Sequence, residues 1–519
     1  MTNPTAVLLS NLQEVLDREV KRLRAAGTDL QSVEVKKAAG GLPQTALESV
    51  CAFANARGGL LMLGLTEEGF RPVNIDAPKL AADLASACSD GLEPAIRPEI
   101  DIARVDSQPV VVARVDPLDY QRRPCYLKSK GMHGGTFLRT HDGDRRLNSY
   151  EVHVMVSGRG QPADDAERVE GAGLEHLDPE LMDGMLRRLR TTRGPVFDRF
   201  GDEEVLNMTG VIAEPTADSA LTLAGLLALG RYPQQFFPQL GASFVVLPTP
   251  DGEPAADGTR FVDNRPLDGP IPTIVSATVD AMLRNMRRRA VVVDAGREDV
   301  WEYPTEAVRE VVANALMHRD YHSTAHGSQT RIRLYPDRFE VSSIGGLHGA
   351  SSGLTSVEDL VERGITATRN AQLAKLLEDV VIPGTGRPVC ENRGSGLRAA
   401  VAALRRAGMS PPRMTDRVNE LRVVIDAPGW TSASTRREAD LQTGAATTAS
   451  PWNLSPRERQ ITELLSDGSQ SSGELADSMG ITRQAVLNWL NLMADRGLVR
   501  PTARNRKSRL NRWELNPDP

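Results

Sequence analysis

Residues 306–322 read EAVREVVANALMHRDYH, and this stretch sets the fold that we expect for the second half of the chain. Apolar residues recur with the period of a helix that is buried on one side: Val308, Val311, Val312 and Ala315. On another face, Glu310, Asn314 and His318 follow at intervals of four. Magnesium prefers oxygen ligands and keeps much of its own water, so this face suits Mg²⁺ beside phosphates. The alternative is an ordinary solvated helix surface.

Two glycine-rich turns follow this helix. Gly345-Gly346 comes after an expected strand at 331–342, and Gly394-Ser395-Gly396 opens an expected helix at 397–407. A glycine-rich turn before a helix presents backbone N–H groups to an anion. The turns therefore favour a phosphate site over a solvated helix face.

Together these residues resemble the divergent GHKL-type ATP-binding domain of a family of bacterial regulators often labelled RecG-like helicases. The helix of that family reads as E-x-x-x-N-A-x-x-H-R-D-Y, which this chain matches at Glu310, Asn314, Ala315, His318, Arg319, Asp320 and Tyr321. Later family motifs are matched by Arg369-Asn370, Glu391 and Gly394-x-Gly396. The sequence contains no GxxxxGK[ST], so we expect no P-loop helicase motor.

The resemblance implies ATP and Mg²⁺ as cofactors. It implies that Asn314 is the Mg²⁺ ligand and that Glu310 polarises the attacking water in any ATPase reaction. The expected nucleotide contacts are Asn314, His318, Gly345, Gly346, Gly394, Ser395 and Gly396. Where the family usually has Asn-Pro-Gly, this chain has Ser343-Ile344-Gly345, so an interaction scaffold that has lost nucleotide stays open as an alternative.

The N-terminal part carries a second pattern, FANARGG at residues 53–59. It resembles the Schlafen AlbA domain over residues 28–155, with further matches at Leu63-Gly64, Glu34-x-Lys36, Pro124-x-Tyr126 and residues 135–139. A compact mixed α/β domain is expected there, with strands at 33–37, 60–65, 109–115 and 136–139 and a helix at 49–56. The resemblance implies nucleic-acid binding and, in some members, RNA cleavage by three acids around a divalent metal.

The acids that such cleavage needs are only partly present. Asp29 and Glu34, with Lys36, stand at the family spacing, and Glu67 is the candidate third acid. Metal-assisted hydrolysis needs its carboxylates around one site, and a shift of one residue along a strand turns a side chain to the other face. We therefore expect this domain to bind nucleic acid or protein. Cleavage by Asp29, Glu34 and Glu67, and a plain surface ion pair of Glu34 with Lys36, are the alternatives.

The C-terminal part predicts a winged helix-turn-helix. A capping box at 455–458 starts one helix, a second is expected at 473–479, and a third begins at Thr482 with its buried face at Val486, Trp489, Leu490 and Met493. On its outer face, Arg483, Gln484 and Asn488 suit hydrogen bonding to base edges of double-stranded DNA. The basic run 500–512 is expected to contact phosphates as the wing, through Arg504, Arg506, Lys507 and Arg509. Pairing with another protein is the alternative use of this fold.

Three weaker patterns lie between these parts. Residues 221–229 predict a short helix that resembles the connecting segment of the same regulator family. Arg284 and residues 287–289 are expected at a solvated helix end, with an approach to phosphate as the alternative. His318, His322 and His326 are spaced by four, but that face has no acidic or Cys partner, so we expect no zinc site.

Composition limits the remaining classes. The chain has 519 residues, enough for about three or four domains, with 40% hydrophobic and 25% charged residues and a formal charge of −6. No apolar run approaches the roughly 20 residues of a membrane helix, so we expect no membrane partner. Four scattered cysteines favour a reducing cytosol. Because the chain is acidic overall, nucleic-acid binding has to be local.

The expected fold class is multidomain α/β and α+β. The expected parts are an AlbA-like domain (1–157), a linker (158–177), a connecting region (178–300), a GHKL-like ATP-binding α/β sandwich (301–427), a flexible linker (428–453) and a winged helix (454–519). This order predicts a cytoplasmic, homo-oligomeric bacterial transcriptional regulator that binds DNA, responds to ATP and is at most a slow ATPase. A metal-dependent nuclease gated by the ATP-binding domain, acting in defence, and a nucleotide-free scaffold are the alternatives.

Overall fold

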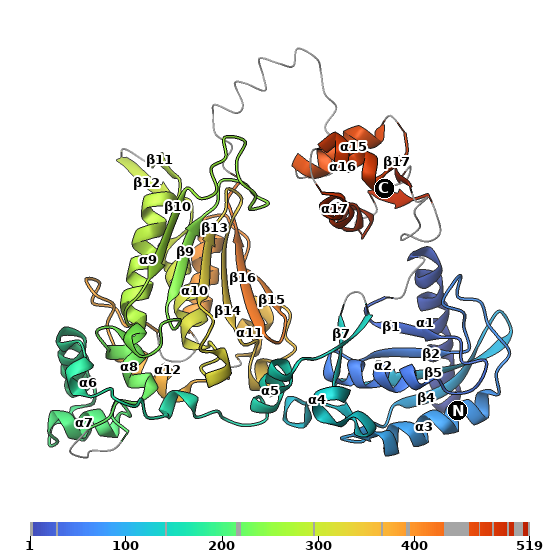
Figure 1. Cartoon of the computed structure of the whole chain (residues 1–519), viewed down its shortest axis with the longest axis horizontal. Coiled ribbons are helices and arrows are strands. Elements are labelled where there is room, and N and C mark those ends of the chain that lie inside the picture. The colour runs from blue at the N-terminus through green and yellow to red at the C-terminus, as the bar shows by residue number, and fades with distance from the viewer. Residues whose placement is uncertain are drawn as a thin grey trace, which may run out of the picture.

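The computed structural model describes residues 4–26, 30–140, 143–213, 219–293, 296–364, 367–390, 395–429, 456–466, 468–479, 482–495, 498–502 and 512–516. Figure 1 shows an N-terminal α/β domain, a larger part built on a six-stranded sheet, and a small C-terminal domain. The mixed α/β multidomain class that the sequence predicts is confirmed.

The N-terminal domain is a four-stranded sheet between two helical layers. Its strand order is β1 (Val33–Lys36), β2 (Gly59–Leu63), β5 (Gln108–Val115) and β4 (Glu99–Val105), and only the β1–β2 pair is parallel. Apolar residues alternate along the strands, so each sheet face has its own core. Helix α1 (Pro4–Ala26) packs on one core, and α2 (Gln44–Asn55) and α3 (Ala77–Gly91) pack on the other.

Shorter elements complete this domain and lead out of it. They are β3 (Leu92–Glu93), η1 (Tyr120–Arg122), β6 (Tyr126–Leu127), η2 (Lys128–Lys130), α4 (Gly131–Gly135), β7 (Phe137–Thr140), β8 (Gly143–Arg146) and α5 (Ser149–Ser157). A capping box starts α5: Asn148 Oδ1 accepts from the Glu151 N–H, and the Glu151 carboxylate accepts from the Asn148 N–H, each at 2.9 Å. Helix α5 runs from the N-terminal domain to the central part (Figure 1).

The central part is a six-stranded sheet covered by helices. Its strand order is β10 (Asp263–Leu267), β9 (Ala242–Val246), β13 (Thr330–Leu334), β14 (Arg338–Ile344), β16 (Glu420–Asp426) and β15 (Arg413–Asp416), with β9 and β13 parallel and the other neighbours antiparallel. The helices α9 (Ile271–Asn285), α10 (Thr305–Met317) and α13 (Ser395–Arg406) pack together over it. The remaining elements of the central part are β11 (Arg288–Val293), β12 (Gly296–Trp301), η6 (Ser323–Ala325), η7 (Gly349–Ser351), α11 (Val357–Arg363) and α12 (Ala371–Leu377).

Two local predictions were wrong. The expected strand at 331–342 is a hairpin of β13 and β14, because Pro336 interrupts the run and Tyr335 N–H donates to the Arg338 carbonyl across the turn at 2.8 Å. The arginines at 287–289 do not end a helix: α9 stops at Asn285, and β11 begins at Arg288 and pairs with β12.

Residues 164–235 form a helical segment that shares the core of the central part. It contains η3 (Asp164–Ala166), η4 (Leu174–His176), α6 (Pro179–Phe197), α7 (Asp202–Met208), α8 (Leu223–Leu229) and η5 (Pro233–Gln235), and the expected helix at 221–229 corresponds to α8. One continuous apolar core extends from Val169 to Ile425. The strands β9 and β10 and helix α9 also precede residue 301, so the six-stranded sheet begins within the region that the sequence assigns to a connector.

The C-terminal domain has three helices and a small antiparallel sheet. The elements are α15 (Pro456–Ser466), β17 (Gln470–Ser471), α16 (Ser472–Met479), α17 (Arg483–Asp495), β18 (Val499–Pro501) and β19 (Arg512–Leu515), with sheet order β17-β19-β18. Val486, Leu490 and Met493 of α17 are fully buried, as the helical spacing predicts. None of the helices in the described part of the chain has the length and apolar character that crossing a bilayer requires.

Candidate functional site

The polar face of α10 brings two of the predicted residues into contact. Asn314 Nδ2 donates to Glu310 Oε1 at 2.7 Å and to the Glu310 carbonyl at 2.8 Å. Residues four apart on a helix are neighbours, which accounts for the pair. Since the amide nitrogen is engaged with Glu310, the Asn314 amide oxygen remains as an acceptor, and no donor in the described part of the chain is bonded to it.

The first turn of α13 packs against the same carboxylate. Glu310 is 6% exposed, and a Cβ at Gly396 would lie 2.0 Å from its Oε1 atom, so a larger residue at position 396 would require the Glu310 carboxylate to move. A carboxylate near a helix N-terminus is favourable because the N–H groups there carry partial positive charge. Glu310, Asn314 and Gly396 are therefore brought together as the sequence predicts. Gly394 lies outside the described residues, and so does the side chain of Ser395.

His318 follows the last residue of α10. Its charged and titratable neighbours are Arg369 and His348. Burial first, then Arg369 and His348, lower the pKa of His318 to about 4. Burial and Arg369 also lower the pKa of His348 to about 4, against the opposing hydrogen bond to the Gly160 carbonyl. Both imidazoles are therefore neutral at pH 7.

The turn at Gly345 and Gly346 does not present N–H groups to an anion in this conformation. The Gly345 N–H donates to the Asn419 carbonyl at 2.9 Å, and the Gly346 N–H donates to the Val418 carbonyl at 2.7 Å. Gly345 has a φ of +83°, and a Cβ on it would lie 1.9 Å from Arg369 Nη1. Because both N–H groups are already engaged, these glycines could contribute to a ligand site only by leaving space for the ligand, not by donating hydrogen bonds to it.

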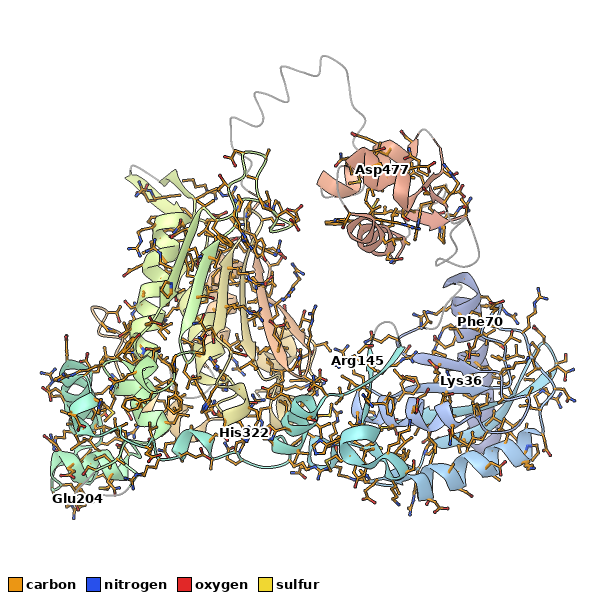
Figure 2. The ribbon with its side chains drawn as sticks, viewed as in Figure 1. Lys36, Phe70, Arg145, Glu204, His322 and Asp477 are labelled. Carbon is orange, nitrogen blue, oxygen red and sulfur yellow. The ribbon has the colours of Figure 1, made fainter. Side chains whose placement is uncertain are left out.

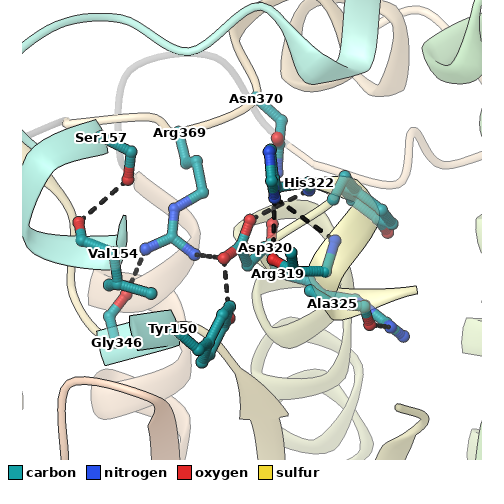
Figure 3. Close-up of polar contacts among 12 residues, drawn as sticks. Tyr150, Val154, Ser157, Arg319, Asp320, His322, Ala325, Gly346, Arg369 and Asn370 are labelled. Carbon is teal, nitrogen blue, oxygen red and sulfur yellow. Dashed lines mark hydrogen bonds and ion pairs between the residues drawn. The ribbon is translucent and has the colours of Figure 1, made fainter. Parts of the chain in front are cut away.

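Asp320 connects the central part to α5 of the N-terminal domain. Figure 3 shows its carboxylate between Tyr150 and Arg369. Tyr150 Oη donates to Asp320 Oδ2 at 2.7 Å, and Arg369 Nη1 lies 4.0 Å from the same oxygen. Beside this bond, the rings of His153 and His322 are in contact, with centroids 3.9 Å apart and planes tilted by 33°. Asp320 and Arg369, which are both matched by the family motifs, thus lie at a junction between domains.

Arg319 and Asn370, also matched by the family motifs, hold the backbone after α10. Arg319 is 1% exposed and donates to the Ala325 carbonyl at 3.0 Å and to the Ser328 carbonyl. Asn370 Nδ2 donates to the carbonyls of Met317 at 2.8 Å and Arg319 at 2.7 Å (Figure 3). These side chains shape the loop, and no nucleotide contact is needed to explain them.

In the N-terminal domain, Glu34 is buried between two cations. Arg139 Nη1 lies 2.6 Å from Glu34 Oε2, and Lys36 Nζ lies 2.5 Å from Glu34 Oε1. Arg139 also bonds to Asp144 Oδ1 at 3.0 Å. Burial lowers the pKa of Arg139, but Glu34 and Asp144 outweigh it and raise the pKa above the usual value. The predicted surface pair of Glu34 with Lys36 exists, but it lies inside a buried network.

The other two predicted nuclease acids do not join Glu34 in the described residues. Glu67 is exposed in the turn after β2, and Asp29 lies outside the described residues. Among the residues described, no group of three or more His, Cys, Asp or Glu side chains is placed to hold a metal ion. Asp144 was missed, although the Asp-Gly pair at 142–143 is typical of a hairpin, whose register sets Asp144 opposite Arg139.

In the C-terminal domain only one predicted DNA contact can be located in full. Arg483 starts α17 and is exposed, and its Nε donates to Ser472 Oγ at 2.9 Å. Gln484 and Asn488 lie on α17, but their side chains are outside the described residues. The wing residues Arg504, Arg506, Lys507 and Arg509 lie outside them as well.

Comparison with protein families identifies three segments. Residues 29–148 match "Schlafen, AlbA_2", residues 153–241 match a domain of unknown function (DUF8451), and residues 327–425 match HATPase_c_4, described as "Putative ATP-dependent DNA helicase recG C-terminal". These matches confirm the two resemblances that the motifs indicate. No curated protein matches the chain.

Two solved structures are similar in sequence over defined lengths. The DIP2311 protein from Corynebacterium diphtheriae is 20% identical, with 97% of each chain covered and a TM-score of 0.37. The N-terminal domain of a "Putative ATP-dependent DNA Helicase RecG-related Protein" from Nitrosomonas europaea is 32% identical, with 25% of this chain and 90% of that chain covered and a TM-score of 0.21. The chain therefore carries one segment that matches Schlafen AlbA_2 and another that matches HATPase_c_4.

Proposed function

We propose that this protein is a DNA-binding transcriptional regulator whose DNA affinity or oligomeric state responds to ATP. The observation that carries the proposal is the contact of Glu310, Asn314 and Gly396, because it joins a carboxylate, a carboxamide and a helix N-terminus in one place. The HATPase_c_4 match over 327–425 supports ATP as the ligand.

The residues fit a nucleotide with Mg²⁺. Asn314 offers an amide oxygen, which is a ligand that magnesium accepts, while its nitrogen stays bonded to Glu310. Bound Mg²⁺ would neutralise phosphate charge. Glu310 would orient a water, and the first turn of α13 would face the phosphates with its N–H groups. The carboxylate lies against that turn, so a phosphate entering there has to compete with it, which is consistent with slow turnover at most.

The C-terminal domain is the proposed contact with double-stranded DNA. Its three helices and small sheet follow the order of a winged helix, with α17 as the recognition helix and the basic run 500–512 as the wing. Arg483 at the exposed start of α17 supports this reading.

The AlbA_2 domain is proposed to bind nucleic acid without cutting it. Metal-dependent hydrolysis requires ionised carboxylates that are free to hold an ion, whereas both Glu34 oxygens are engaged by Arg139 and Lys36. The nuclease stays a second candidate only through Asp29, which lies outside the described residues.

The test is calorimetric titration of ATP–Mg²⁺ into the full chain and three variants. Asn314→Ala should weaken binding by at least about tenfold, or ~1.4 kcal/mol. Glu310→Gln should bind ATP and lose any hydrolysis. Glu306→Gln is the matched control: Glu306 lies one turn earlier on α10, is partly exposed, and within the described residues forms an ion pair with Arg406 alone, at 3.4 Å. It should behave as the wild type.

Two outcomes would overturn the proposal. Equal ATP affinity in Asn314→Ala and Glu306→Gln would mean that the polar face of α10 is not the nucleotide site. Absence of ATP binding in the wild type would leave the interaction scaffold as the function. When binding is found, DNA affinity measured with and without ATP tests the regulatory part.

A further inference from the structure

A cavity of about 530 Å³ lies between the N-terminal domain and the central part. One wall is formed by the loop at 55–58 within the FANARGG motif, together with Tyr120 and Arg123. The other wall is formed by residues 352–354 and Asp416 of the central part. Small-molecule sites commonly have volumes of about 300–1,000 Å³, so the cavity has the size of a ligand site.

Positive charge dominates the lining. Arg57 is exposed to the cavity and has no carboxylate within 4.0 Å in the described part of the chain. Arg123 donates hydrogen bonds to two carbonyls, those of Leu118 at 2.8 Å and Ala56 at 3.0 Å. Like Arg57, it forms no ion pair in the described part of the chain. Neither guanidinium has a direct ion pair in the described residues, although Asp416 interacts electrostatically with both and Asp119 with Arg123. Two guanidinium groups in one concavity attract an anion.

The other charged residues that line the cavity do not reverse its net positive charge. Arg22 is paired with Glu19 at 2.9 Å, and Arg139 is paired with Glu34. Asp416 is the one acid among the described lining residues. Burial raises its pKa, against the hydrogen bonds from the Val418 and Leu347 N–H groups and the nearby charges of Arg369 and Arg57, which lower it.

The Arg57 loop is held in place before any ligand arrives. Asn55 Nδ2 donates to the Cys125 and Phe137 carbonyls at 2.8 Å each, and Asn55 Oδ1 accepts from the Cys125 N–H at 2.6 Å. Gly58 has a φ of +77° and lies so close to β5 that a Cβ would meet the Val115 carbonyl at 2.5 Å. A rigid loop presents Arg57 with little ordering cost on binding.

Both walls are tied together beside the cavity. Tyr150 bonds to Asp320, His348 Nε2 donates to the Gly160 carbonyl at 3.2 Å, and Gln161 Nε2 donates to the Arg369 carbonyl at 2.7 Å. In Figure 2, His322 marks the central part near this junction and Lys36 lies within the N-terminal domain. A ligand in the cavity therefore contacts both domains.

We propose that this cavity is a second ligand site, separate from the polar face of α10, and that it binds a small molecule bearing a phosphate or pyrophosphate group between Arg57 and Arg123. The site needs neither Asn314 nor Mg²⁺, so it stands or falls independently of the proposed ATP site.

The experiment is calorimetric titration of inorganic pyrophosphate, without Mg²⁺, into the full chain. Arg57→Ala removes a charge that forms no direct ion pair in the described part of the chain, so the variant should stay folded. Arg97→Ala is the control, because Arg97 is an exposed arginine of the same domain that does not line the cavity. Binding should be equal in the wild type and Arg97→Ala and should weaken at least tenfold in Arg57→Ala. Asp416→Asn, which removes the acid and keeps an acceptor oxygen, should strengthen binding.

Asn314→Ala separates this site from the proposed ATP site, since its pyrophosphate affinity should equal that of the wild type. The proposal is overturned by wild-type protein that does not bind pyrophosphate, or by equal affinities of Arg57→Ala and Arg97→Ala. A single-stranded oligonucleotide without a terminal phosphate that displaces pyrophosphate in an Arg57-dependent manner would assign the cavity to nucleic acid and overturn the small ligand.

Discussion

At the scale of single residues, buried charges decide what each candidate site can do. Glu34 was predicted as a nuclease acid or as one half of a surface ion pair. The pairing with Lys36 follows from their i, i+2 spacing on one strand face. The buried partner Arg139 is more than 100 positions away in sequence, and only the fold brings it to Glu34.

Glu34→Ala should destabilise the N-terminal domain because Arg139, whose side chain is 3% exposed, loses one of its two carboxylates. Breaking a buried pair from one side costs about 3–5 kcal/mol. Urea unfolding followed by far-ultraviolet circular dichroism measures this loss in the free energy of unfolding. Glu67→Ala, at an exposed position, should leave stability unchanged. If the wild type cleaves RNA in a metal-dependent way and a folded Glu34→Gln variant does not, the nuclease function would replace non-catalytic binding.

Stability should fall between pH 6.5 and pH 4 because of His318 and His348. Their pKa values in the folded chain are about 4, below the ordinary value of 6.5, so the unfolded chain binds more protons in this window. The contribution is complete above pH 6.5 and decreases as the pH falls, by at most about 1.4 kcal/mol per pH unit for each histidine. Melting temperatures from pH 4.5 to 7.5 measure the slope, and His348→Gln should reduce it. An unchanged slope would show that His348 does not contribute.

At the scale of elements, the contact between α10 and α13 is the part of the candidate site that the sequence predicted best. Helical spacing placed Glu310 and Asn314 together, and the Gly-x-Gly motif marked the start of α13. Periodicity did not reveal that the Gly345 and Gly346 N–H groups donate to carbonyls of the turn between β15 and β16. The hairpin at β13 and β14 was also missed, although Pro336 marks its turn.

Gly396→Ala should displace the Glu310 carboxylate from the start of α13, because the new Cβ would lie 2.0 Å from Glu310 Oε1. Overpacking of this kind costs about 1–3 kcal/mol, and the ATP affinity should fall with the stability. Differential scanning calorimetry with and without ATP–Mg²⁺ tests both effects. Gly184→Ala is the control: it lies in α6 with no atom within 4 Å of the added Cβ, and it should be neutral or slightly stabilising.

Arg483→Ala should cost about 1–3 kcal/mol at a specific DNA site if α17 is the recognition helix. Arg483 also bonds to Ser472, so Ser472→Ala is needed as a second variant: it removes that bond and keeps the guanidinium. Fluorescence anisotropy with a selected operator should show the loss in Arg483→Ala and a much smaller change in Ser472→Ala. Equal losses in the two variants would assign the arginine a structural role.

At the scale of the whole molecule, the sequence identified the parts but not how they are joined. The AlbA_2 and HATPase_c_4 segments were recognised from short motifs. The bond of Tyr150 to Asp320 and the shared core from Val169 to Ile425 depend on tertiary packing between distant segments, which no local pattern records.

Tyr150→Phe should weaken the coupling between the two domains and leave each one folded. The lost hydrogen bond to a charged carboxylate is worth about 1.5–3 kcal/mol, and burial and Asp320 already raise the pKa of Tyr150, so the hydroxyl stays a donor at neutral pH. Hydrogen exchange at α5 with and without ATP–Mg²⁺ should show protection in the wild type and less in the variant. Tyr232→Phe, at a side chain that is 51% exposed, should match the wild type.

The parallel pairing of β9 with β13 has a practical consequence for work on isolated fragments. A recombinant fragment cut to the HATPase_c_4 match at 327–425 would omit β9 and α10. One side of β13 would then carry a row of unpaired N–H and C=O groups, and such an edge recruits strands from other molecules. Precipitation of that fragment would be explained by the absence of β9. A soluble fragment should therefore include residues from at least Val169 onward.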